Sequence, residues 1–75
     1  MRLTELTADL HALREDLAGE LLAINRYEEQ LFSLADEDAK ETVNRIVEDK
    51  KEHVARLLAM IQRLDVKQRE KLERL

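Results

Sequence analysis

The chain has 75 residues, which allows one small domain covering residues 1–75, and 40% of them are charged, with a net charge of −4. Acidic and basic residues are interspersed, and the aromatic residues are limited to Tyr27 and Phe32, so nothing favours nucleic-acid binding. The chain has no cysteine, which excludes a disulfide framework and a thiolate metal site. No apolar run approaches the length of a membrane span or a signal-peptide core, so we expect a soluble protein of the cytoplasm without membrane contact.

The composition indicates an all-α protein, because proline is absent and strong helix formers dominate. A helical apolar repeat predicts a first helix that starts after residues 1–3, with Thr4 or Thr7 as its N-cap, and ends near Leu34 or Ala35. The inward positions of this repeat are Leu3, Leu6, Leu10, Leu13, Leu17, Glu20, Ile24, Tyr27, Leu31 and Leu34.

An acidic connector at residues 36–38 separates the first helix from the second. Asp38 and Glu41 have the spacing of a capping box, which predicts that the second helix begins there and runs to about Arg63 or Leu64. A connection this short places the two helices in an antiparallel hairpin.

A third, short helix is predicted after the hairpin. Asp65 has the character of an N-cap, with Gln68 as its capping-box partner, and a helix from about Val66 would carry a fresh apolar edge at Leu72 and Leu75.

The second helix contains two polar residues where its repeat calls for apolar ones, Lys50 and His53. Its predicted inward positions are Ala39, Val43, Ile46, Lys50, His53, Leu57, Met60 and Leu64. A charged residue in such a position costs stability unless it has a partner, a metal or a role. The first helix has one such exception of its own, Glu20, which follows the single glycine, Gly19.

These three polar residues are predicted to form one layer across the hairpin. Glu20 precedes the centre of the connector by about as many residues as His53 follows it, and Lys50 lies one turn away on the same face. A two-helix hairpin leaves its inner face half exposed, so we expect a second copy to cover it in a four-helix bundle. Two copies of Glu20, Lys50 and His53 would then face one another across the dimer axis.

With these residues placed, the chain resembles the encapsulated ferritins, which are two-helix members of the ferritin-like superfamily. The matching stretches are Glu20-Leu-Leu-Ala-Ile-Asn-Arg-Tyr27-Glu, Lys50-Lys-Glu-His53 and Leu64-Asp65, within roughly residues 10–72. The resemblance implies a symmetric dimer of hairpins with a di-iron site at its interface. It also implies assembly of dimers into a ring, oxidation of Fe(II), and storage of the product inside an encapsulin shell.

By this resemblance Glu20 and His53 are iron ligands and catalytic residues, and Tyr27 is the tyrosine beside the site. The chain departs from the family at Lys50, which occupies the position of a metal-binding glutamate. A protonated ammonium has no lone pair for a metal and repels a cation. Asp49, four residues before His53, could supply a carboxylate from the flank.

Two functions therefore stay open at this point. The first is iron binding of the encapsulated-ferritin type, with ferroxidase activity at the dimer interface. The second is a metal-free helical oligomerisation or scaffold module, in which an ion-pair cluster of Glu20 and Lys50 replaces the di-iron centre.

Overall fold

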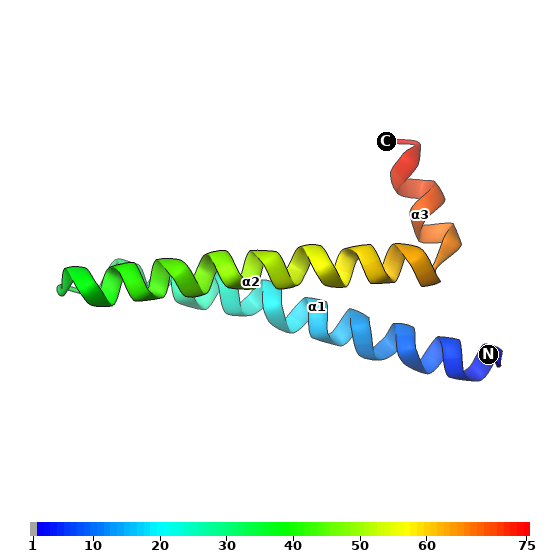
Figure 1. Cartoon of the computed structure of the whole chain (residues 1–75), viewed down its shortest axis with the longest axis horizontal. Coiled ribbons are helices and arrows are strands. Elements are labelled where there is room, and N and C mark those ends of the chain that lie inside the picture. The colour runs from blue at the N-terminus through cyan, green and yellow to red at the C-terminus, as the bar shows by residue number, and fades with distance from the viewer. Residues whose placement is uncertain (1) are drawn as a thin grey trace.

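A computed structural model describes residues 2–75 as three helices and no strands (Figure 1). Helix α1 spans Leu3–Leu31, α2 spans Glu37–Leu64 and α3 spans Val66–Glu73. The first two lie side by side as an antiparallel hairpin, and α3 turns away from it at the open end (Figure 1). The predicted all-α hairpin with a short C-terminal helix is therefore confirmed. No helix in residues 2–75 is both long and apolar enough to cross a bilayer.

The predicted start of the first helix was wrong in its capping residue. Arg2 is the N-cap, and its backbone N–H donates to the Glu5 carboxylate over 3.3 Å. Thr4 and Thr7 both lie inside the helix, and the Thr7 hydroxyl donates to the Leu3 carbonyl. Glu5, at the third helical position, thus reaches back to the N–H of the N-cap residue, as the glutamate of a capping box does.

The boundary between α1 and α2 also differs from the prediction. Helix α1 ends at Leu31, earlier than expected, because the next backbone N–H groups bond back into a tighter turn. The cap of α2 is Asp36, whose Oδ2 accepts from the Ala39 N–H at 2.8 Å. The predicted capping box of Asp38 and Glu41 was therefore wrong, because the helix begins two residues earlier and Asp36 caps the free N–H group of Ala39.

The end of α2 and the start of α3 agree with the prediction. Asp65 Oδ1 accepts from the Gln68 N–H at 3.1 Å and so caps α3. Its other oxygen, Oδ2, accepts from the Arg14 guanidinium of α1 at 2.8 Å. The backbone hydrogen bond from Gln68 and the one from Arg14 lower the pKa of the Asp65 carboxyl. One side chain thus caps α3 and joins it to α1.

The core between the helices is thin, with three buried apolar residues in the part of the chain described, namely Leu10, Val47 and Ile61. The stripe of α2 that packs on α1 is made of Val43, Val47, Lys50, Val54, Leu57, Ile61 and Leu64. This corrects the predicted stripe at three of its positions, where the packed residue is the following one. Ile61 is 5% exposed, for example, whereas its predicted neighbour Met60 is 38% exposed. The stripe with Ile46, His53 and Met60 flanks the core instead.

Candidate functional site

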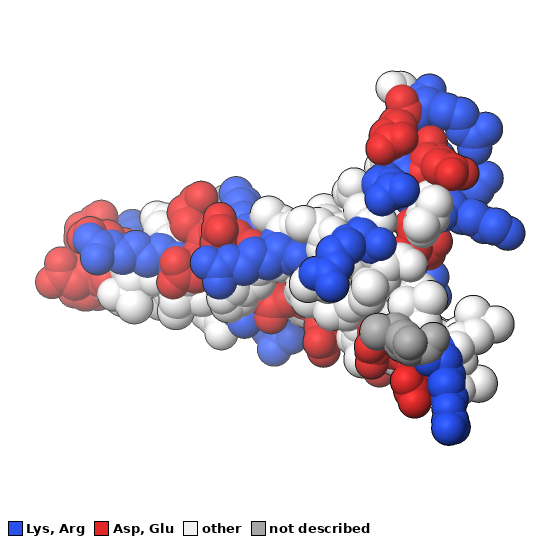
Figure 2. Space-filling model, turned by 45° about the vertical axis from the view of Figure 1, so that its right-hand side comes forward, with Lys and Arg blue, Asp and Glu red and all other residues white. Residues whose placement is uncertain are grey.

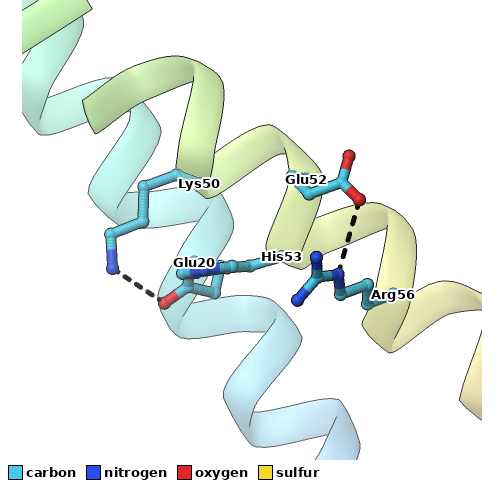
Figure 3. A network of polar contacts seen from close by, with 5 residues as sticks. All are labelled: Glu20, Lys50, Glu52, His53 and Arg56. Carbon is cyan, nitrogen blue, oxygen red and sulfur yellow. Dashed lines mark hydrogen bonds and ion pairs between the residues drawn. The ribbon is translucent and has the colours of Figure 1, made fainter. Parts of the chain in front are cut away.

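The Glu20 carboxylate of α1 lies between two side chains of α2, Lys50 and His53 (Figure 3). Lys50 Nζ donates to Oε1 of Glu20 at 3.1 Å, and His53 Nδ1 lies 2.9 Å from Oε2. Glu20 and Lys50 are half-buried, while the His53 side chain is 49% exposed. The structure therefore brings together the three polar residues that the sequence placed in one layer.

The contacts favour an ionised Glu20. The hydrogen bond from Lys50, followed by the one from His53, holds the pKa of the Glu20 carboxyl below its ordinary value. An ionised carboxylate only accepts hydrogen bonds, so Nδ1 of His53 carries the proton in this contact. The second ring nitrogen, Nε2, has no protein partner among residues 2–75.

Glu20 and His53 also border an open hollow of about 490 Å³ on one side of the hairpin. Asp16, one helical turn before Glu20, and Gly19 are part of its wall. A Cβ atom at Gly19 would meet nothing within 4 Å, so this wall has free space in the single chain. Sequence reasoning missed Asp16, although its spacing of four residues from Glu20 was a signal for it.

Arg56 lines the same hollow from α2, and its guanidinium pairs with a neighbouring carboxylate of the same helix. Arg56 Nε lies 3.4 Å from the Glu52 carboxylate, with which it forms an ion pair one turn apart on the same helix (Figure 3). The cations that reach Glu20 within the described chain are therefore Lys50 and, when charged, His53.

The other predicted site residues lie apart from this layer. Asp49 is exposed and lines a separate depression on α2, whose wall includes Arg45 and Glu48. Tyr27 is half-buried two turns after Glu20 in the inner stripe of α1, and its hydroxyl makes no hydrogen bond to protein groups of residues 2–75. The structure thus places Tyr27 in the packing and Asp49 on the surface.

The donor set does not fit a di-iron centre. Such a centre in a four-helix bundle takes a glutamate from each of two helices and a Glu-x-x-His pair from each of the other two. Two copies of this chain would bring two glutamates and two histidines, with Lys50 in place of each remaining glutamate. Within residues 2–75, no three His, Asp or Glu side chains surround a common point suited to a metal.

Comparison with known proteins gives one family match. The family described as Ubiquinone biosynthesis protein COQ7 matches residues 8–70. Its members are ferritin-like proteins of the di-iron carboxylate type. No curated protein and no solved structure matches the chain.

Proposed function

The chain belongs to the COQ7 family, and hence to the ferritin-like superfamily, and we propose that it is a metal-free helical association module of that superfamily. In this proposal the cluster of Glu20, Lys50 and His53 occupies the place of a metal centre. The module works by joining copies of the hairpin rather than by catalysis.

One observation carries the proposal, namely that both oxygens of Glu20 are already paired inside the chain. Lys50 bonds to Oε1 and His53 to Oε2 at hydrogen-bond distances. The charges of Glu20 and Lys50 cancel, so two clusters can approach without a metal to neutralise them. A di-iron site needs the opposite, an excess of carboxylates that two ferrous ions offset.

The thin core supports association with a second copy. With three buried apolar residues among residues 2–75, a chain of this size has little internal packing to hold its fold. The side of the hairpin beside the cluster exposes part of Met60 and borders Gly19, where a neighbouring helix has room to approach. The cluster lies near the middle of both long helices, so a two-fold axis there would set the two clusters face to face.

Metal analysis tests this proposal directly. The protein is purified after expression with added iron, and its metal content and thermal unfolding are measured with and without a chelator. We expect far less than one iron ion per dimer, and we expect the chelator to leave the midpoint of thermal unfolding unchanged. Stoichiometric iron that is lost in His53→Ala would overturn the metal-free proposal.

The second candidate function is Fe(II) oxidation at Glu20 and His53, and the COQ7 match favours it because that family binds a di-iron centre. The unpaired Nε2 of His53 is the atom that would bind the metal. Assembly into a ring and storage in an encapsulin shell belong to this candidate and rest on the encapsulated-ferritin resemblance.

Aerobic addition of Fe(II) to the apoprotein, followed by ferric absorbance, tests the second candidate. Excess oxidation over buffer that disappears in His53→Ala would support it, and oxidation equal to buffer would exclude it. The matched gain-of-function variant is Lys50→Glu, which restores the Glu-x-x-His spacing with His53. Oxidation that appears only in Lys50→Glu would identify Lys50 as the residue that separates the module from an enzyme.

A further inference from the structure

An exposed aromatic side chain marks one end of the hairpin. Phe32 follows the last residue of α1 at the tip and is 92% exposed. Phenylalanine buries a large apolar area when it finds a pocket, so a ring left in water is a candidate contact residue. The Glu20 cluster does not use it.

A hollow of about 300 Å³ lies at the opposite end, in the angle between the hairpin and α3. Its apolar wall comes from all three helices, through Leu17 of α1, Leu58 of α2 and Leu72 of α3, and Gln68 lies at its α3 side. Arg14, whose bond to Asp65 fixes the start of α3, borders the same hollow. The hollow is thus a built feature of the α2–α3 corner.

Phe32 and this hollow open on the same side of the hairpin. Phe32 follows Arg14 by 18 residues, which is five full turns of a helix, so both project from one side of α1. Leu21 lies on that side between them and is 48% exposed. A two-fold axis midway along α1 would therefore place Phe32 of each copy at the hollow of the other and cover Leu21.

The charges of the two ends are complementary (Figure 2). Residues 28–38 around the tip contain five acidic residues and no Lys or Arg, whereas residues 66–75 contain four basic and two acidic residues. In Figure 2 red side chains predominate at the extreme tip, with blue ones beside them, and blue side chains line the outer side of α3, with red ones among them. An antiparallel pair sets each acidic tip against a basic α3, and a parallel pair would set like charges together.

We propose that two copies of this chain pair antiparallel through the α3 side of the hairpin, with Phe32 of each seated in the corner hollow of the other. The partner is thus a second copy of the same chain. This interface is on the opposite side of the hairpin from the Glu20–His53 hollow. The pairing therefore does not depend on whether the Glu20 cluster binds a metal.

Engineered disulfides test the pairing, because the natural chain has no cysteine. In the double variant Ser33→Cys with Gln68→Cys, the proposed pairing places the thiol at position 33 of each copy near the thiol at position 68 of the other. The same two positions cannot be linked within one chain, because the 28 residues of α2 hold them about 40 Å apart. We expect mild oxidation to give one closed covalent dimer on a non-reducing gel. The single variants S33C and Q68C are the controls and should give far less.

Two outcomes of this experiment would overturn the proposal. Cross-linking no greater than in the single variants would show that the tip and the α3 corner do not meet. A ladder of covalent oligomers would indicate head-to-tail or random contact in place of a closed pair.

The contribution of the Phe32 side chain to self-association is measured separately by sedimentation of the full chain. Phe32→Ala should weaken self-association by at least about tenfold, as expected for an aromatic anchor in a pocket. Leu22→Ala is the matched control, since Leu22 is also exposed on α1 but follows Leu21 on a different side. Raising the salt concentration should weaken the pairing as well, because it screens the contacts between tip and α3. Equal effects of F32A and L22A would refute the role of Phe32.

Discussion

Ile61 and Met60 are adjacent in sequence, and truncating each one to alanine distinguishes the two sides of α2. Ile61 is 5% exposed and packs on α1, whereas Met60 is 38% exposed on the flank beside the Glu20 cluster. Ile61→Ala removes three carbons, roughly 2.4 kcal/mol of lost burial, and the cavity raises the cost to about 3 kcal/mol. Met60→Ala should cost about 1 kcal/mol in the single chain, because water already reaches part of its side chain.

This difference is large against the total stability of a small domain. A chain of 75 residues is expected to have an unfolding free energy of roughly 4–11 kcal/mol. Ile61→Ala therefore removes a quarter or more of it. Urea unfolding followed by circular dichroism at 222 nm measures both losses, because nearly every residue that contributes lies in a helix.

The same urea unfolding experiment is repeated at several protein concentrations. A second copy on the flank would bury Met60 further, so the loss in Met60→Ala should grow with concentration while the loss in Ile61→Ala stays constant. Equal losses for the two variants at the lowest concentration would refute the assignment of the packed stripe. Concentration-independent midpoints would refute association through this flank.

Three further predictions follow from single contacts. Folding lowers the pKa of Glu20, so its contribution to the free energy of unfolding is present above its ordinary pKa of 4.5 and is lost as the pH falls below that value. Between pH 7 and pH 3 the urea midpoint should therefore fall less in Glu20→Gln than in the unchanged chain. Identical pH profiles of the two proteins would contradict this. Asp36→Ala should lower the free energy of urea unfolding by about 1 kcal/mol, because it removes the side chain that caps the N–H of Ala39. The control Asp38→Ala should cost clearly less. A larger loss in Asp38→Ala than in Asp36→Ala would favour the capping box of Asp38 predicted from the sequence. Gly19→Ala should raise the unfolding free energy by about 0.5–1 kcal/mol at low concentration, because the added Cβ meets open space, and a loss measured there would mean that the site is crowded.

The polar layer was predictable because helix geometry converts sequence distance into height. Glu20 lies 11 residues before the end of α1, and Lys50 and His53 lie 13 and 16 residues after the start of α2. A rise of 1.5 Å per residue therefore places the three side chains within about 8 Å of one another in height. The cap of α3 was predictable for a similar local reason, since Asp65 contacts the N–H of Gln68 three residues later. The cap of α2 was not, because the acidic connector offers several carboxylates and only the turn geometry selects Asp36.

By itself, the sequence determined the all-α hairpin, the short third helix and the coincidence of Glu20, Lys50 and His53 in one layer. The tertiary structure decided how α2 is rotated about its own axis. Apolar residues occupy two neighbouring stripes of that helix, so its period fits either one, and the burial of Val47 and Ile61 selects between them. That rotation leaves His53 at the edge and directs Lys50 onto Glu20 at 3.1 Å, which is why an ion-pair cluster occupies the position of a metal centre.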